Sequence, residues 1–375
     1  MMFKNRGRYY MTLLGYWASQ EQYSMQNLLE FVVEAEKGGF TSVLTSDHFH
    51  PWWHDDGFGN FTWVWLAAAA ERTKKMKFTT GVTAAVYRYN PGIIAQAFAS
   101  LDVLYPGRIG LGIGTGEAMN EVPLGFDWPD AGIRLERTKE SIQIINKLWK
   151  KKYQSQALII TDTERGNEKC QNKGDDEDGR TDNNVNFIGN YFRLKNARLY
   201  TPPSTDIPLY MAASGPDAIQ VAAKYTNGLI STSKPDNAKE TFDIFDKAAV
   251  DKGKDPTILE KIAKPKISYS EDYDAAVRSC EFWRASLIEN IFDLDISDPI
   301  KLQEKAKQEI SDDKLKQSIL IVTKIDDLIK PIEGYFKAGF TQVFTHSTSP
   351  NEKEFIQKFT KGVLPYFIDK SNNKR

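Results

Sequence analysis

The chain has 375 residues, of which 41% are hydrophobic, and a formal net charge of −1. This length fits one large α/β domain or two ordinary ones, and the near-zero charge excludes a general attraction to nucleic acid or to a membrane surface. The two cysteines are too few for a disulfide framework, and no apolar stretch reaches the length of a membrane span. We therefore expect a soluble, cytoplasmic protein whose partners are small molecules.

Apolar runs of the strand type alternate with helical patterns along the chain. Eight strands are expected to begin near residues 11, 42, 78, 108, 207, 228, 262 and 341, and the seventh is expected to run to residue 270. Helices are expected over 25–37, 61–73, 93–104, 132–151, 216–223, 238–250, 273–286, 325–338 and 351–367. Strand–helix alternation forms a parallel sheet with right-handed crossovers. Eight such units predict a single α/β domain over residues 1–375, a (β/α)8 TIM barrel with insertions.

Two segments extend beyond the bare barrel. Residues 154–186 are rich in Asp, Glu, Asn, Gly and Lys, a composition that predicts a mobile polar insertion at the surface. A hairpin pattern around residues 189–190 follows it. Residues 287–317, between the seventh and eighth units, are predicted to form an insertion near the barrel mouth.

The loop over residues 45–54 follows the second strand and holds three of the four histidines. The C-terminal ends of the strands carry the chemistry in barrels of this kind. His48 and His50 form an HxH pair that can hold a metal, but a catalytic metal site takes about three protein ligands, so we expect none. His54 is interpreted as a surface histidine.

Two tryptophans and an acid near the same strand ends have ordinary explanations as well. Trp52 and Trp53 fit a hydrophobic core, but adjacent residues point in different directions, so we expect one of them to face the barrel mouth. Glu21 fits a solvated acid, and it gains interest because residues after the first strand also converge on the mouth. Residues 17–21 are expected to form a turn.

Glycines alternate with other residues over 110–116 and end at Glu117. A dinucleotide-binding fingerprint would open directly into a helix and carry an acid about 20 residues on, which this pattern does not. Gly110 and Gly112 are therefore expected to allow close packing of neighbouring strands. Residues 114–117, at the C-terminal end of the strand, are expected to contact a cofactor.

Four separate motifs carry a resemblance to a known family over nearly the whole chain, except roughly residues 154–182. They lie at residues 15–23, 46–52, 88–91 and 114–121. They resemble the bacterial luciferase-like barrels that use the deazaflavin coenzyme F420, and in particular the glucose-6-phosphate dehydrogenases and alcohol dehydrogenases of that family. The resemblance implies a luciferase-like TIM barrel, coenzyme F420 as cofactor and a homodimer.

The resemblance also implies roles for single residues. In the catalytic group, His48 matches the catalytic histidine, Trp52 the tryptophan beside the reacting carbon, Glu117 the acid near the deazaflavin ring and Glu21 a carboxylate that supports the histidine. The cofactor-binding matches are Asp47, Thr115, Gly116, Asn120, Ser214 and Gly215. The last two begin the helix that would hold the cofactor phosphate, as helix N-termini attract phosphate. The substrate-binding matches are Thr232, Lys234 and Lys266.

The expected reaction is hydride transfer between the CH–OH group of a sugar phosphate similar to glucose 6-phosphate and coenzyme F420. The two matched lysines favour an anionic substrate, but Glu281 stands where the family has a phosphate-binding arginine and would repel phosphate. Arg284 is expected to point elsewhere on its helix. An F420-dependent secondary alcohol dehydrogenase is the alternative, followed by an FMN-dependent luciferase-like monooxygenase. A metal-dependent hydrolase and a non-catalytic cofactor-binding protein also remain open.

Overall fold

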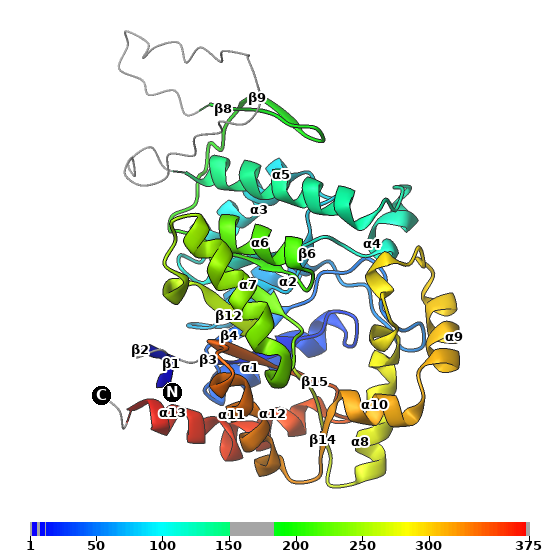
Figure 1. Cartoon of the computed structure of the whole chain (residues 1–375). Helices are drawn as coiled ribbons and strands as arrows, with labels where there is room; N and C mark the ends of the chain where they lie inside the picture. Colours follow the sequence, from blue (N-terminus) through cyan, green and yellow to red (C-terminus); the bar gives the residue numbers. More distant parts are fainter. Residues whose placement is uncertain (1, 6–7, 12, 151–183, 373–375) are drawn as a thin grey trace.

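Eight parallel strands form a closed barrel in the computed structural model, which describes residues 2–5, 8–11, 13–150 and 184–372 (Figure 1). In the order of pairing they are β3 (Leu13–Ala18), β4 (Ser42–Thr45), β5 (Lys77–Thr80), β7 (Ile109–Gly114), β10 (Leu209–Ala212), β11 (Gly228–Ser231), β12 (Glu260–Ala263) and β15 (Gln342–Ser347). The barrel closes at β15, which pairs with β3 on one side and with β12 on the other. The predicted (β/α)8 fold is confirmed.

Helices surround the barrel on the outside (Figure 1). They are α1 (Met25–Lys37), α2 (Thr62–Arg72), α3 (Pro91–Leu104), α5 (Ala131–Trp149), α6 (Pro216–Tyr225), α7 (Ala238–Asp251), α11 (Ile329–Lys337), α12 (Glu352–Gly362) and α13 (Leu364–Asn372). The start of α1 shows how the sequence sets a boundary: Ser24 Oγ accepts a hydrogen bond from the backbone of Asn27 at 3.2 Å, which satisfies a donor that the first helical turn leaves free.

Hydrophobic side chains fill the barrel and the layer outside it. Inside lie Trp17, Leu44, Tyr210, Ile230, Ile262 and Phe344. The larger core lies between the strands and the helices and includes Phe78, Phe98, Phe245 and Phe355, each completely buried. Burial of this apolar area stabilises the fold by about 25 cal/mol per Å². The mouth of the barrel therefore lies over a packed hydrophobic core.

Some predicted elements are interrupted where the backbone chemistry requires it. The strand expected over 262–270 is broken into β12 and β13 (Lys266–Tyr269), because Pro265 has no N–H to give to the ladder. β13 then pairs with β14 (Leu320–Val322) and with the end of β15. The last helix is divided in two just before Pro365. The turn expected over 17–21 begins later, because β3 runs to Ala18.

The segment after β13 forms a separate group of helices beside the barrel, at the right of Figure 1. It contains α8 (Tyr273–Ser279), η4 (Cys280–Leu287), η5 (Ile291–Asp293), α9 (Pro299–Glu309) and α10 (Asp312–Ser318). Gln303 Oε1 of α9 accepts hydrogen bonds from the backbone N–H groups of His54 and Asp55 at 3.0 and 3.1 Å. Part of the segment 287–317 therefore packs on the histidine-rich loop after β4.

The same group of helices corrects one expectation. Arg284 Nη2 lies 2.7 Å from Glu281 Oε2 and 2.5 Å from Asp312 Oδ1, and Arg284 Nη1 donates to the backbone oxygen of Ile310. The expectation that Arg284 points away from Glu281 was wrong, because residues i and i+3 lie on one face of a helical turn, in a 3-10 helix as in an α-helix. The negative charge of Glu281 is thus paired within the protein.

Two short antiparallel pairs of strands lie outside the barrel sheet. β1 (Met2–Asn5) pairs with β2 (Arg8–Met11), and β8 (Val185–Ile188) forms the predicted hairpin with β9 (Arg193–Ala197). The insertion predicted over 154–186 falls almost entirely outside the described residues. None of the described helices combines the length and the apolar character that a membrane crossing requires.

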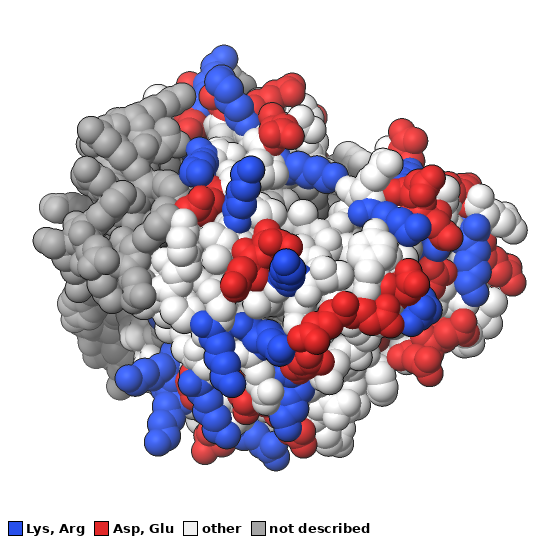
Figure 2. Space-filling view, turned by 90° about the horizontal axis from the view of Figure 1, so that it is seen from below, with Lys and Arg blue, Asp and Glu red and all other residues white. Residues whose placement is uncertain are grey.

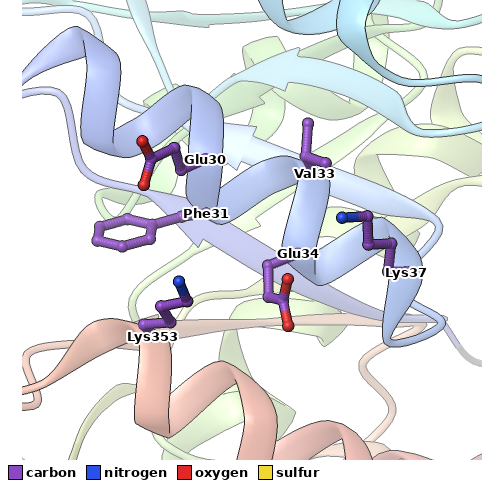
Figure 3. A pocket seen from close by; sticks show the side chains of 6 residues that line it. All are labelled: Glu30, Phe31, Val33, Glu34, Lys37 and Lys353. Carbon is purple, nitrogen blue, oxygen red and sulfur yellow. The ribbon is translucent and has the colours of Figure 1, made fainter.

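The outer surface carries mixed charge. Acidic and basic side chains are interspersed over the face seen in Figure 2, in keeping with a net charge of −1. A shallow hollow lies between α1 and α12, and Figure 3 shows the side chains that line it. These are Glu30, Phe31, Val33, Glu34, Lys37 and Lys353.

The close packing of β7 against β5 gives a stability prediction. A Cβ on Gly112 would lie 2.0 Å from the backbone oxygen of Thr80, so Gly112→Ala is expected to lower the free energy of unfolding by about 1–3 kcal/mol. Gly132→Ala is the matched control, because nothing lies within 4 Å of a Cβ there and alanine favours a helix. Urea unfolding of both variants measures the difference, and equal stabilities would contradict the packing argument.

Candidate active site

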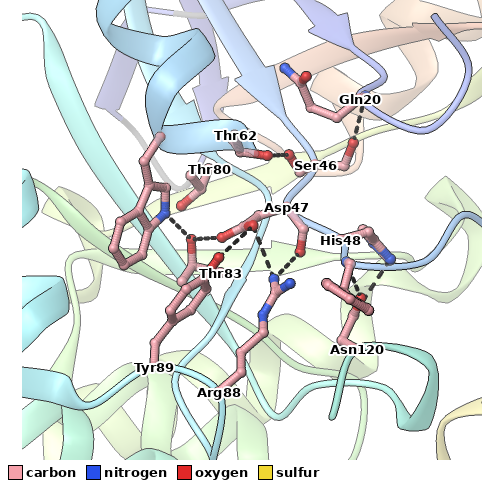
Figure 4. Close-up of polar contacts among 12 residues, drawn as sticks. Gln20, Ser46, Asp47, His48, Thr62, Thr80, Thr83, Arg88, Tyr89 and Asn120 are labelled. Atoms are coloured by element: carbon pink, nitrogen blue, oxygen red, sulfur yellow. Dashed lines mark hydrogen bonds and ion pairs between the residues drawn. The ribbon is translucent and has the colours of Figure 1, made fainter. Parts of the chain in front are cut away.

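Ionisable side chains from separate strand ends meet at the C-terminal end of the barrel (Figure 4). Asp47 and His48 follow β4, and Glu21 follows β3. Glu117 is the N-cap of the short helix α4 (Ala118–Glu121), which follows β7 and contains Asn120. Parallel strands deliver their carboxyl ends to the same edge of a barrel, so residues far apart in sequence become neighbours.

His48 lies between two polar partners. Its Nε2 is 3.3 Å from Glu21 Oε1, and its Nδ1 is 3.5 Å from the amide nitrogen of Asn120. Since an amide nitrogen only donates, Nδ1 carries the lone pair and Nε2 carries the hydrogen. Burial lowers the pKa of His48 to about 3, with help from the positive charges of Arg88 and Lys264. The imidazole is therefore neutral over the whole physiological range.

The acids of the site are shifted in the opposite direction. Burial raises the pKa of Glu21 to about 7, although its Oε2 accepts a hydrogen bond from Ser46 Oγ. Burial also raises the pKa of Glu117, whose Oε2 accepts a hydrogen bond from Asn120 Nδ2 at 2.8 Å. Asn120 Oδ1 accepts from the backbone of Phe49 at 2.7 Å. Asn120 thus holds the base His48 and the acid Glu117 in one arrangement.

Asp47 is held by a network of donors. Arg88 Nη2 donates to Asp47 Oδ1 at 2.9 Å and to the backbone oxygen of Asp47 at 2.6 Å, and Thr83 Oγ1 donates to Oδ2 at 2.8 Å. Figure 4 shows these contacts together with Tyr89, whose hydroxyl lies 3.5 Å from Oδ1. Both partners of the ion pair are buried. The network fixes the loop that carries His48.

Glu121 is a buried acid that the sequence patterns did not single out. Its Oε2 accepts a hydrogen bond from the backbone of Arg88 at 2.8 Å, while its Oε1 has no partner among the described residues. The side chain is completely buried, and burial raises its pKa to about 7. An unsatisfied buried acceptor of this kind is costly unless a ligand completes it.

Trp52 and Trp53 are both buried. Their rings point in different directions, as expected for adjacent residues. The Trp52 ring lies 5.7 Å from the His48 ring and meets Phe292 edge-on at 6.1 Å. Trp53 lies under Lys307 of α9. Trp52 therefore faces the ionisable cluster, and Trp53 faces the neighbouring helices.

The other predicted cofactor residues lie near the same edge of the barrel. Thr115 is half-buried and Gly116 has a left-handed backbone with φ +81°. Ser214 and Gly215 are exposed, and Gly215 is the N-cap of α6, where its backbone oxygen accepts from Ile219 at 3.0 Å. Since Pro216 has no N–H, the first backbone donors of α6 are the N–H groups of Asp217 and Ala218.

The three predicted substrate residues differ in their burial and in their contacts. Lys266 is half-buried, and its Nζ donates to Ser286 Oγ at 2.7 Å. Thr232 and Lys234 are exposed, and Lys234 Nζ donates to the backbone oxygen of Gln317 at 3.4 Å. Lys264, which no sequence motif marked, reaches the mouth from the end of β12.

The other two histidines of the histidine-rich loop, His50 and His54, have different surroundings from His48. His50 Nδ1 lies 3.0 Å from the backbone oxygen of Ser297, and the His54 side chain is exposed. Across the described residues, no three His, Cys, Asp or Glu side chains gather closely enough to hold a metal ion.

Known proteins resemble this chain over almost its full length. Residues 9–342 match the model of the luciferase-like monooxygenase family. The F420-dependent glucose-6-phosphate dehydrogenase of Microbacterium testaceum (strain StLB037) is 33% identical over 354 residues, which are 94% of this chain and 96% of that protein. The enzyme of the same name from Rhodococcus erythropolis is 32% identical over 357 residues, with 94% and 96% covered.

A solved structure is also similar to this chain over almost its full length. The structure of an F420-dependent secondary alcohol dehydrogenase in complex with an F420–acetone adduct superposes with a TM-score of 0.83 and 34% sequence identity. The superposition covers 94% of this chain and 98% of the other. An F420-dependent tetrahydromethanopterin reductase from Methanopyrus kandleri, at 19% identity and a TM-score of 0.73, shares the fold.

The buried carboxyl of Glu121 makes stability depend on pH. Its pKa is about 7 in the folded chain against 4.5 when exposed, so its contribution to stability is fully present below pH 4.5 and is lost as the pH rises through 7. Glu121→Gln is therefore expected to raise the free energy of unfolding at pH 8, by about 3 kcal/mol at most, and to change it little at pH 5. Urea unfolding at both pH values tests this, with Glu304→Gln on exposed α9 as control.

Proposed function

The chain belongs to the luciferase-like monooxygenase family, and from this premise we propose that it is an F420-dependent oxidoreductase acting on a CH–OH donor. It transfers a hydride between the hydroxyl-bearing carbon of its substrate and coenzyme F420. The observation that carries the proposal is the cluster of Glu21, His48, Asn120 and Glu117, in which a neutral imidazole and buried acids share one barrel mouth.

The residues at the mouth fit a planar deazaflavin ring. Glu121 Oε1 is a buried acceptor without a partner in the described chain, and an N–H of such a ring would satisfy it. Gly116 lies beside this oxygen and has a left-handed backbone with φ +81°, which glycine adopts without strain. Bound F420 would supply the hydride chemistry. We assign its binding to Asp47, Thr115, Gly116, Asn120, Ser214 and Gly215, with the last two at the helix N-terminus that suits phosphate.

The side chains divide the proton transfers between them. His48 is the base that accepts the hydroxyl proton of the substrate, and the carboxyl of Glu21 beside Nε2 stabilises the imidazolium that forms. Burial raises the pKa of Glu117, which favours its protonated form, and we assign Glu117 to donate a proton toward the cofactor side of the site. Trp52 packs beside His48 and excludes water from the reacting carbon.

A sugar phosphate similar to glucose 6-phosphate is the substrate class that we favour. The relatives named glucose-6-phosphate dehydrogenase are 32–33% identical over nearly the whole chain, and lysines reach the mouth. The negative charge of Glu281 does not argue against phosphate, because Arg284 pairs with it. We assign Thr232, Lys234 and Lys266 to substrate binding, and residues 287–317 to a wall of the substrate site.

A secondary alcohol is the alternative substrate. The superposition with the F420-dependent secondary alcohol dehydrogenase supports it, as does the apolar group of side chains around Trp52 and Trp53. The two possibilities differ in whether the substrate carries charge. We also propose a homodimer located in the cytoplasm, which size-exclusion chromatography with light scattering and cell fractionation test.

The reaction is tested with the purified protein and oxidised F420. Loss of F420 fluorescence is measured with glucose 6-phosphate, other sugar phosphates and 2-propanol, and again with FMN in place of F420. We expect F420 reduction by at least one sugar phosphate and no turnover with FMN. If no CH–OH donor in the panel reduces F420, the protein is not the dehydrogenase proposed.

Two substitutions test the assigned proton transfers. His48→Ala and Glu117→Gln are each expected to lower kcat by roughly 10²–10⁴-fold, because each removes one proton-transfer group. Affinity for F420, measured from fluorescence quenching, is expected to stay within about threefold. His54→Ala is the matched control, since that side chain is exposed. Full activity in both site variants would remove these residues from the mechanism.

A further inference from the structure

An arginine in the first turn of α5 lies between two walls of the barrel mouth. The side chain of Arg134 is 3% exposed. Its Nη1 donates to the backbone oxygen of Pro129 at 2.7 Å, in the loop before α5. Its Nη2 donates to the backbone oxygen of Phe292 at 2.8 Å and to Asp293 Oδ1 at 3.0 Å, both in η5. One guanidinium thus joins two segments that are far apart in the sequence.

The loop before α5 is the anchored end of this contact. The central carbon of the Arg134 guanidinium lies 4.2 Å from the centroid of the Trp128 ring, an arrangement in which the ring attracts the cation. A Cβ on Gly116 would lie 3.6 Å from the edge of the same ring, so Trp128 reaches the chain just after β7. Because β7 is paired on both sides within the barrel, this end of the contact is held in place.

The η5 end has less support of its own. It is a single 3-10 turn of three residues, in which the N–H of Asp293 donates to the backbone oxygen of Asn290 at 2.8 Å. The side chain of Asp293 is 60% exposed. A single turn of this kind makes few backbone hydrogen bonds. The two bonds from Arg134 therefore decide where η5 lies.

η5 places an aromatic ring beside the proposed base. The Phe292 ring meets the Trp52 ring edge-on at 6.1 Å, and the Trp52 ring lies 5.7 Å from the ring of His48. Phe292 is 46% exposed, so part of its ring is free to touch another molecule. A half-exposed aromatic ring next to a reacting group suits contact with the C–H surface of a bound substrate.

We propose that Arg134 is a positioning residue, whose guanidinium holds η5 so that Phe292 forms an apolar contact for the carbon skeleton of the substrate. The inference rests on the proposed dehydrogenase function and deepens it. It names the residue in the wall over 287–317 that contacts the substrate, and the residue that places this contact. Arg134 itself is buried and acts through Phe292.

Hydrogen–deuterium exchange tests the placement of η5 without any turnover. Arg134→Met keeps most of the length of the side chain and removes its donors. In the full-length protein, the backbone amides of residues 290–294 are expected to exchange roughly threefold faster or more, because η5 is no longer held. Unchanged exchange in this segment would show that Arg134 does not hold the turn.

Two further variants control the exchange experiment. One turn further along α5, Arg137 also lies over an aromatic ring, with its central carbon 3.9 Å from the centroid of Tyr87. Arg137→Met is therefore the matched control and is expected to leave the exchange of residues 290–294 unchanged. Arg134→Lys is expected to be intermediate, because an ammonium keeps the charge but lacks the planar fork of the guanidinium. It also serves if Arg134→Met does not fold.

Kinetics then connect η5 to the substrate. With glucose 6-phosphate and with 2-propanol, for each donor that reduces F420, Phe292→Ala is expected to raise KM roughly fivefold or more and to leave kcat within about threefold. The reason is that a contact away from the reacting atoms binds the ground state and the transition state alike. Tyr273→Ala is the matched control, because Tyr273 is 48% exposed at the start of α8.

A double variant shows whether Arg134 acts through Phe292. Arg134→Met alone is expected to raise KM as Phe292→Ala does, with affinity for F420 within about threefold. In the Phe292→Ala background, Arg134→Met is expected to raise KM by no more than about twofold further, because two residues that act through one contact are not additive. A merely structural role of Arg134 would act equally in both backgrounds.

The two failures are distinguishable. If the effects of the two substitutions on KM add, or if Phe292→Ala leaves KM unchanged for every donor that reduces F420, the inference is overturned, although F420 reduction would still support the dehydrogenase. If no donor in the panel reduces F420, the proposed function fails and the substrate contact of Phe292 fails with it. The exchange of residues 290–294 then still shows whether Arg134 holds η5.

Discussion

Removal of water from ionisable groups is the physical effect on which the mouth of this barrel depends. Burial favours the uncharged form of every such group, so it keeps the imidazole of His48 as a base and favours the protonated form of Glu117. In water, the carboxyl of Glu117 would be ionised at neutral pH, so a neutral imidazole and a protonated carboxyl would not coexist there. The barrel favours both together, because the ends of β4 and β7 bring them to one buried place over a packed interior.

Two cations add to this effect. Arg88 and Lys264 each carry a charge that lowers the pKa of His48, although burial is the larger cause. Arg88 is paired with Asp47, so its charge is partly offset within the protein.

Local signals in the sequence predicted the barrel and the loop after β4, but not the contacts that depend on three-dimensional neighbours. The N-cap at Ser24 and the apolar run before Ser46 act over a few residues, so α1 and the loop after β4 follow from the sequence. Lys264 gave no such signal, because its ammonium is placed over the ring of Trp17 in a distant strand. The pairing of Glu281 with Arg284 has the local i, i+3 spacing, but the pairing of Arg284 with Asp312 depends on how α10 packs against η4. The role of Asn120 between His48 and Glu117 required the geometry of two loops.

The hydrogen bonds of α9 have a mechanical consequence. Gln303 holds the backbone of His54 and Asp55, and the backbone of Ser297 lies against His50. The loop that positions the base is therefore fastened to the helices beside the mouth. Any displacement of α9 that widens the entrance must break these bonds or pull the loop with it. The same hydrogen bonds therefore limit the width of the entrance and hold the loop that aligns His48.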